Sequence, residues 1–451
     1  MPTSVPARKQ ALRVLHVGNV ANNAYLNAKL QRRAGIEADA LCDEWHIFAQ
    51  PEWEEADLRG AFEAEEELAS TAAAVGWTRP DWVLGLRFWD PDFSQERWLR
   101  ERLRVLGDLP HLALRRRKLC PIYAPLRAVL GRDLRVLDLA HGSMWRRRLD
   151  RRVGSLHALF GEYDLVQLYG LHPALLPSGL ARVPYVAFEH GTMREYPFED
   201  FWRGRLLALG YRLSNKVIIT NPDVVEQARL LGLEDDRYAF VPHPLDETRY
   251  CPGPSELRAE VERDGFDFVL LCPSRHDWHV KGLDRLVGAF AQLVRSERPK
   301  AVLFLFDWGQ EVQRSRSLVQ ELGIEGNVRW SPPLSKVRLI DAYRAADIVC
   351  DQFLIGTFGA VAPEAMACGT PVVMAFDGEI HRWCFSVLPP VVDARTPEQI
   401  YSALRRLAED DGERARLGQL GREWVERHHG WRLVVDRHLE IYEEVLDGKR
   451  R

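Results

Sequence analysis

The chain has 451 residues, of which 46% are hydrophobic and 28% charged, and its formal net charge is −4 at pH 7. This length predicts two or three globular domains, and the near-neutral charge argues against a general nucleic-acid binder. No run of eighteen or more apolar residues is present, so we expect no membrane-spanning helix. Residues 1–10 lack the apolar segment of a signal peptide and the seven cysteines form no CxxC pair, which favours the reducing cytoplasm.

A strand–helix–strand pattern opens the chain. A predicted strand at Arg13–Val17 leads into a Gly- and Asn-rich turn over residues 18–23, which lacks a complete GxGxxG motif and is therefore a weak dinucleotide signature. A helix over about 24–33 and a strand at 36–42 follow, and such βαβ units build doubly wound sheets. Further buried strands are predicted at 163–168, 185–188, 216–220 and 238–241.

Residues 43–152 break this alternation and are predicted to be a mostly helical insertion. Residues 97–152 hold 16 Arg and Lys against 5 Asp and Glu, interleaved with Leu, Trp and Tyr. One interpretation is a solvated helical bundle, and the other is peripheral contact with an anionic membrane. Asp90 and Asp92 have the DxD spacing of a divalent-metal site, which we attribute to coincidence. We expect no metal.

Two cations follow a predicted strand in the second half of the chain. Phe268–Cys272 has the pattern of a buried strand and an amphipathic helix opens at Leu283, so Arg275 and Lys281 lie in the connecting loop. Open α/β sheets bind ligands at the carboxyl ends of their strands. A guanidinium contacts two phosphate oxygens and an ammonium adds a point charge, so this pair is suited to neutralise a diphosphate.

The segment from Phe358 to Val373 predicts a loop, a helix and a strand. Gly369 fits the left-handed residue that ends a helix, and Pro371 prevents the helix from continuing. The helix start offers free backbone N–H groups to an anion, and Glu364 is suited to accept hydrogen bonds from a sugar diol. Taken alone, the segment also fits an ordinary buried connection.

In their order and spacing, these features resemble the retaining nucleotide-sugar glycosyltransferases of family 4, over residues from about 212 to 430. The resemblance rests on Arg275, Lys281 and the stretches Val241–Asp246, Glu321–Val328, Tyr343–Asp347 and Glu364–Gly369. It implies the α/β GT-B fold, in which two Rossmann-like doubly wound domains face each other across a cleft. The implied parts are an acceptor domain (1–245), a nucleotide-sugar domain (246–430) and a C-terminal helix (431–451) that crosses back to the first domain.

The resemblance also implies which residues form the site. Arg275 and Lys281 would contact the donor pyrophosphate, Glu364 the nucleotide ribose, and His190, at a strand end, would orient the sugar. Glu189 beside it is either a partner of His190 or directed to the opposite face. The other donor-binding candidates are Thr357, Phe358, Gly359 and Ala360 at the helix start, Pro333 and Leu334 near the base, and Gly18 and Asn22 in the first turn.

One position departs from the family pattern. The family carries two glutamates with seven residues between them, and the first contacts the hydroxyl groups of the donor sugar. Counting back from Glu364 places Gly356 at that position. We therefore expect a donor pocket in which loop backbone amides, water or another carboxylate hold the sugar.

The predicted reaction moves a sugar from a nucleoside-diphosphate donor to a hydroxyl group, with retention of configuration and with neither metal nor other cofactor. The acceptor is expected to be a glycan, a small molecule or a lipid-linked molecule, and no nucleic acid is expected to bind. Two alternatives remain: a GT-B epimerase or phosphorylase, and a non-catalytic module that binds nucleotide sugars.

Overall fold

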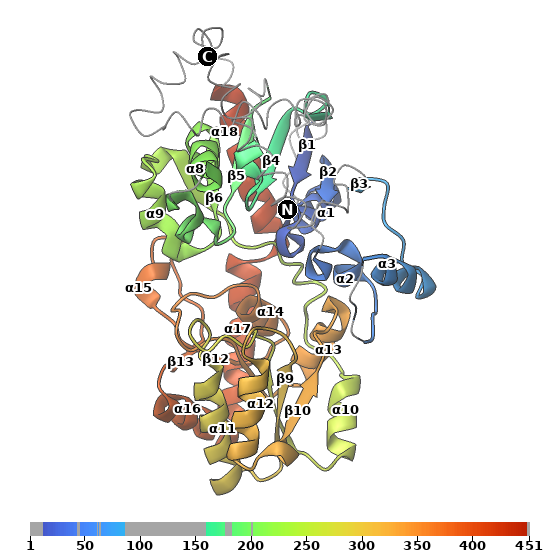
Figure 1. The fold of residues 1–451 in the computed structure, drawn as a ribbon, viewed down its shortest axis with the longest axis vertical. Helices are drawn as coiled ribbons and strands as arrows, with labels where there is room; N and C mark the ends of the chain where they lie inside the picture. Colours follow the sequence, from blue (N-terminus) through green and yellow to red (C-terminus); the bar gives the residue numbers. More distant parts are fainter. Residues whose placement is uncertain are drawn as a thin grey trace, which may run out of the picture.

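The computed structural model describes residues 12–42, 46–60, 62, 65–85, 159–175, 183–199 and 202–448. Within this part of the chain, two parallel sheets are stacked along the long axis of the molecule (Figure 1). Within the predicted insertion 43–152, residues Pro51–Glu55 and Glu65–Ala74 are helical, but Val83–Gly85 form an edge strand of the first sheet, so the prediction that the insertion starts directly after residue 42 was wrong. Asp90, Asp92 and the basic segment 97–152 lie outside the described residues, so the helical character of that part and its membrane contact stay predictions.

The first sheet has seven parallel strands in the order β3-β2-β1-β4-β5-β6-β7, and this order reverses between β1 and β4. The central strands β4 and β5 are buried at every residue, as is usual for parallel sheets, whose faces are both covered by helices. The strands are β1 (Arg13–Val17), β2 (Glu37–Cys42), β3 (Val83–Gly85), β4 (Leu165–Tyr169), β5 (Tyr185–Phe188), β6 (Lys216–Ile219) and β7 (Tyr238–Phe240).

Helices and short 3-10 turns connect these strands. Ala21 and Asn22 both have positive φ angles, 47° and 60°, and this abrupt turn lets a long helix begin at once after β1. The helical elements are η2 (Val20–Asn22), α1 (Asn23–Arg33), η3 (Ile47–Ala49), α2 (Pro51–Glu55), α3 (Glu65–Ala74), η6 (His172–Leu175), η7 (Thr192–Arg194), η8 (Tyr196–Phe198), α8 (Trp202–Leu213), η9 (Pro222–Val224), α9 (Val225–Leu230) and η10 (Asp235–Arg237).

The second sheet has six parallel strands in the order β10-β9-β8-β11-β12-β13 and reverses between β8 and β11. Its strands are β8 (Phe268–Cys272), β9 (Ala301–Phe306), β10 (Val328–Ser331), β11 (Ile348–Cys350), β12 (Val372–Met374) and β13 (Val392–Asp393). Its helical elements are α10 (Glu256–Arg263), α11 (Leu283–Ser296), α12 (Val312–Glu321), η11 (Glu325–Asn327), α13 (Lys336–Ala345), α14 (Val361–Ala367), α15 (Gly378–His381), α16 (Pro397–Glu409) and α17 (Asp411–His428).

These two doubly wound sheets confirm the predicted α/β architecture. The strands at 185–188 and 268–272 and the start of α11 at Leu283 match the predicted bounds, and Gly369 has the expected positive φ of 80° after α14. Residues 358–360 form a loop, and the helix begins only at Val361.

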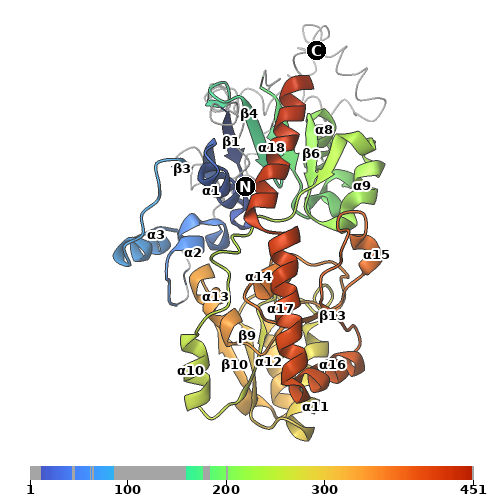
Figure 2. The same cartoon turned by 180° about the vertical axis from the view of Figure 1, so that it is seen from behind.

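The chain passes between the domains twice, near residues 241–250 and again at 429–430. α17 runs along the second domain and α18 (Trp431–Gly448) continues it along the first, end to end on one side of the molecule (Figure 2). α18 buries Val434, Leu439 and Tyr442 in the core that also holds Val14 of β1. The C-terminal helix is therefore part of the first domain's core.

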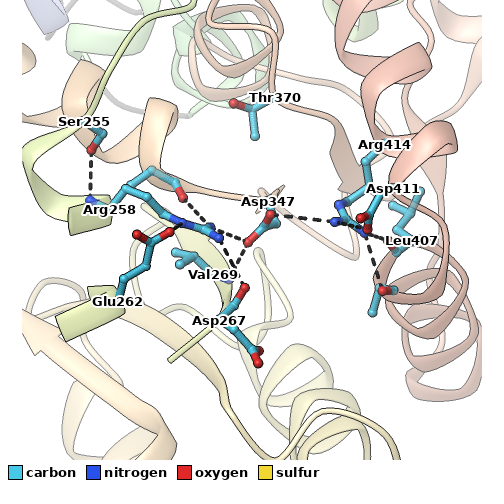
Figure 3. A network of polar contacts seen from close by, with 12 residues as sticks. Ser255, Arg258, Glu262, Asp267, Val269, Asp347, Thr370, Leu407, Asp411 and Arg414 are labelled. Carbon is cyan, nitrogen blue, oxygen red and sulfur yellow. Dashed lines mark hydrogen bonds and ion pairs between the residues drawn. The ribbon is translucent and has the colours of Figure 1, made fainter. Parts of the chain in front are cut away.

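Asp347, in the loop before β11, joins three elements of the second domain (Figure 3). One carboxylate oxygen lies 2.7 Å from Nη1 of Arg258 in α10 and accepts a hydrogen bond of 2.8 Å from the backbone N–H of Val269 in β8. The other oxygen lies 3.9 Å from Arg414 in α17. The aspartate of the Tyr343–Asp347 stretch is therefore a structural residue.

We expect Asp347→Ala to lower the free energy of unfolding by roughly 1.5–3 kcal/mol, because it removes a charged acceptor from a partly buried guanidinium and a backbone N–H. Asp411→Ala is the matched control, since Asp411 pairs with Arg414 at 2.6 Å while its side chain is 85% exposed. That exposed pair should contribute less than about 1 kcal/mol. Urea unfolding of both variants measures the difference, and equal losses would contradict the role given to Asp347.

Candidate active site

Two loops meet at the point where the second sheet reverses. The loop after β8 spans residues 273–282 and the loop after β11 spans residues 351–360. They are joined by hydrogen bonds from the Ser274 hydroxyl to the Asp351 carboxylate at 2.6 Å and from Phe353 N to Lys281 O at 2.8 Å. Ligands of doubly wound sheets bind at this kind of reversal, so the fold itself selects these loops as a site.

A glutamine connects Lys281 to the second of these loops. The Lys281 ammonium donates to Oε1 of Gln352 at 2.8 Å, and the amide nitrogen of Gln352 donates to the backbone carbonyl of Thr357. Gln352 is 3% exposed and Thr357 is 3% exposed, so this connection is buried. The structure thus brings Lys281 next to residues 356–360. No sequence pattern marks Gln352, because its role depends on the contact between the two loops.

Arg275 lies in the same loop as Lys281, and among the described residues its guanidinium has only a weak contact with a neighbouring side chain. Its side chain is 47% exposed, and its ion pair with Asp277 is a long one of 3.4 Å. Asp277 also accepts a hydrogen bond from Val280 N at 3.0 Å, and its carbonyl accepts one from Lys281 N at 2.7 Å. Asp277 therefore shapes the loop, while the guanidinium stays accessible to a ligand.

Glu364 lies in the first turn of α14, where two polar partners hold its carboxylate. Oε1 lies 2.5 Å from the Lys336 ammonium, and Oε2 accepts a hydrogen bond of 2.8 Å from the Tyr343 hydroxyl. Tyr343 is fully buried, and burial together with Glu364 raises the pKa of its hydroxyl well above the usual value. Sequence reasoning missed Lys336 as a partner, although it stands two residues after Leu334 at the start of α13.

Pro333 and Leu334 are half-buried in the loop between β10 and α13. The next residue, Ser335, exchanges hydrogen bonds with the backbone of Leu58 in the first domain. A small pocket at this junction is lined by Glu364 together with Glu54, Arg249 and Tyr250. Glu364 and the predicted base loop therefore face the first domain.

Gly356 has no room for a side chain. A Cβ atom built there would lie 2.7 Å from Cβ of Asp377, and Asp377 N donates to Gly356 O at 2.8 Å. The Asp377 carboxylate caps α15 by accepting a hydrogen bond from Glu379 N at 3.0 Å. A second carboxylate thus stands beside the position where the family has its first glutamate, a neighbour that the sequence spacing could not reveal.

The loop that enters α14 has a buried part and an accessible part. Phe358 is 5% exposed and stacks on Phe376 and His381 at ring-centroid distances of 6.2 and 5.0 Å. Its side chain belongs to the core. Gly359 is half-buried and Ala360 is exposed, so these two members of the predicted donor-binding set are accessible to a ligand.

In the first domain, His190 follows β5 and meets Asn23, the first residue of α1. His190 Nδ1 lies 3.3 Å from the Asn23 amide nitrogen, and its ring packs edge-on against His243 at 5.2 Å. Burial, assisted by Arg194, lowers the pKa of His190 to about 4. Glu189 is fully buried on the opposite side, where Asn221 donates to it at 3.0 Å, so it is no partner of His190.

Gly18 and Asn22 lie in the turn after β1, where they hold neighbouring parts of the chain. A Cβ atom at Gly18 would lie 2.2 Å from Nδ1 of His172, which explains the glycine. Asn22 is 1% exposed and its amide donates to the carbonyl oxygens of Phe48 and Gln50. A donor contact by the Asn22 side chain would have to replace these bonds.

Among the residues that the structure describes, no three His, Cys, Asp or Glu side chains gather into a possible metal site. None of the described helices is both long and apolar enough to span a bilayer.

Comparison with known proteins identifies the family of this chain. The family described as Glycosyl transferases group 1 matches residues 255–424. The chain is 30% identical to a D-inositol 3-phosphate glycosyltransferase of Xylanimonas cellulosilytica, over 72% of this chain and 76% of the relative. It is 31% identical to a protein of the same name from Catenulispora acidiphila, over 69% of this chain and 73% of the relative.

Solved structures show the same fold at low sequence identity. A sucrose-phosphate synthase from Thermosynechococcus elongatus aligns with a TM-score of 0.64 at 17% identity, over 97% of this chain and 100% of that structure. Anabaena HepE in complex with UDP aligns with a TM-score of 0.62 at 15% identity, over 96% and 100%. The chain therefore belongs to the glycosyl transferases group 1 family, and it is a glycosyltransferase with the two-domain GT-B fold.

Proposed function

We propose that this glycosyltransferase moves a sugar from a nucleoside-diphosphate sugar to an acceptor hydroxyl with retention of configuration and without a metal ion. The observation that carries the proposal is that Arg275 and Lys281 both lie in the loop after β8, where the strand order of the second sheet reverses. Lys281 is fixed there through Gln352, and Arg275 stays accessible. Solved structures of the same fold contain UDP and UDP-glucose, which supports a nucleotide sugar as donor.

The cations are proposed to act on the leaving group. When the bond between the sugar and the diphosphate breaks, its electron pair passes to the phosphate oxygen and negative charge builds there. Fixed positive groups stabilise this state more than the ground state, so they lower the barrier. The acceptor hydroxyl attacks the same face of the sugar and gives its proton to the leaving phosphate. No enzyme nucleophile is required in this reaction.

Glu364 is proposed to bind the nucleotide ribose. Its two oxygens already hold Lys336 and Tyr343, which fixes the carboxylate rotamer before any ligand arrives. An oriented carboxylate binds a diol with a smaller loss of side-chain entropy than a free one. The ribose hydroxyls would share these oxygens with the two partners, next to the base loop at Pro333 and Leu334.

The first expected outcome concerns the reaction itself. With a panel of UDP-, GDP- and ADP-sugars, and with D-inositol 3-phosphate and simple polyols as acceptors, we expect release of nucleoside diphosphate that depends on the acceptor. NMR should show the donor's anomeric configuration in the product, and excess EDTA should leave the rate unchanged. Loss of activity in EDTA with rescue by Mn²⁺ would contradict the metal-free proposal. A product without acceptor, or a requirement for inorganic phosphate, would indicate an epimerase or a phosphorylase instead.

The second expected outcome concerns the two cations. Arg275→Ala and Lys281→Ala should each lower turnover by about 100- to 1,000-fold, as does the loss of one group aimed at developing charge. The matched controls are Arg263→Ala and Lys300→Ala, which remove exposed cations at the opposite, amino end of β8 and β9 and should retain the wild-type rate. Wild-type turnover in both site variants would disprove the diphosphate assignment.

The third expected outcome concerns position 356. Gly356→Glu should lower the thermal unfolding midpoint, because the new side chain overlaps Asp377, and such overpacking costs about 1–3 kcal/mol. Combining Gly356→Glu with Asp377→Gly removes the overlapping Cβ and should recover most of that loss, with Asp377→Gly alone as the control. If position 356 faces the sugar, the double variant should rank the donor panel differently from wild type. An unchanged ranking would place residue 356 away from the sugar.

A further inference from the structure

We propose that Asn23 is a positioning residue that keeps the proton of His190 on Nε2, so that this nitrogen is a hydrogen-bond donor in the active site. The contacts of Asn23 with Val20 and His190 determine this arrangement. A third contact, with His243, connects Asn23 to the linker between the domains. The location of the proton follows from the contacts of the first domain alone. Its use in catalysis rests on the proposed function, in which His190 orients the sugar.

The backbone carbonyl of Val20 fixes the orientation of the Asn23 amide. The side-chain nitrogen of Asn23 lies 3.0 Å from Val20 O, and a carbonyl oxygen can only accept a hydrogen bond. The flipped amide would bring two oxygens together in a site where Asn23 is only 4% exposed. The positive φ angles of Ala21 and Asn22 turn the chain so that Val20 O comes within reach of this side chain.

The orientation of the amide then determines the tautomer of His190. The amide nitrogen that faces Val20 O also lies 3.3 Å from His190 Nδ1, and it carries a second hydrogen for that contact. Nδ1 must therefore accept, so a neutral His190 carries its proton on Nε2. The ring is neutral at pH 7 because burial and Arg194 lower the pKa of His190 to about 4. Nε2 makes no hydrogen bond within the described part of the chain, so its N–H is available to a ligand.

The oxygen of the same amide determines the tautomer of a second histidine, His243. Asn23 Oδ1 lies 3.3 Å from His243 Nδ1, and because this oxygen only accepts, His243 carries its proton on Nδ1. His243 stands between Pro242 and Pro244 in the first crossing between the domains, where the two rings restrict the backbone. A rigid linker therefore holds the amide from one side, and Val20 O holds it from another.

A donor at Nε2 fits the proposed reaction. The oxygens of a sugar hydroxyl and of a leaving phosphate both accept hydrogen bonds, so an Nε2–H group contacts either one without a change of protonation. The opposite tautomer would present a lone pair and would demand a hydroxyl proton. Asn23 is therefore expected to influence turnover through His190 without contacting the substrate itself.

Nitrogen NMR of the full-length protein labelled with ¹⁵N-histidine tests the inference directly. Long-range ¹H–¹⁵N correlations distinguish a protonated from an unprotonated ring nitrogen, and the His190→Gln variant assigns the His190 signals. At pH 7.5 we expect an unprotonated Nδ1 and a protonated Nε2 in the wild-type protein. An Nδ1–H pattern there would overturn the inference without any variant.

Asn23→Asp provides the second measurement. A carboxylate only accepts hydrogen bonds, so His190 Nδ1 should gain a proton in this variant. Asn27→Asp is the matched control, since Asn27 is buried on the same helix and donates at 2.9 Å to the Tyr169 hydroxyl, away from His190. The control should keep the wild-type His190 signals. An unprotonated Nδ1 in folded Asn23→Asp would contradict the role of the amide.

The catalytic consequence is tested separately. Asn23→Ala should lower kcat about tenfold, the equivalent of one hydrogen bond, and should leave the Kd for UDP unchanged. If the NMR pattern is as expected but Asn23→Ala and His190→Ala retain the wild-type kcat, the proposed use of His190 is wrong while the assigned tautomer stands. If the NMR pattern fails while His190→Ala loses turnover, the role of Asn23 is wrong and the proposed function stands.

Discussion

The candidate site depends on the contact between the loops that follow β8 and β11. These strands are adjacent and parallel, and the order in which strands are added to the sheet reverses between them. Both loops therefore leave the same edge of the sheet in opposite directions. Two successive hydrogen bonds, from Lys281 to Gln352 and from Gln352 to Thr357, join the loops. Because Gln352 is buried, breaking these bonds would leave polar groups unsatisfied, and that cost fixes the ammonium in place before a substrate binds.

In the first domain, too, two loops meet where the strand order of the sheet reverses, between β1 and β4. The loops after β1 and β4 meet where Gly18 gives room to His172, and the neighbouring β5 carries His190 to the same edge. Asn23 and His243 connect this edge to the linker. Polar side chains with fixed partners therefore stand at the carboxyl edge of the first sheet, next to the linker between the domains.

Features that depend on local sequence were predictable. Continuous apolar runs identified β5 and β8, and Gly369 before Thr370 and Pro371 identified the end of α14, because strand burial and helix termination are encoded within a few residues. The loop positions of Arg275 and Lys281 followed from the same patterns. What the sequence could not reveal was each contact made across the fold: Gln352 under Lys281, Lys336 on Glu364, and Asp377 against Gly356.

The segment after β2 has a consequence for the motion of the two domains. Asp57 forms an ion pair with Arg338, and Leu58 is hydrogen-bonded to Ser335. The segment after β2 therefore contacts the start of α13 in the second domain (Figure 1). The ion pair is partly exposed, and such pairs weaken as salt screens them. Any separation of the two domains would have to break this ion pair, which lies away from the two linkers. Ionic strength would then influence any such separation as well as the binding of a charged donor.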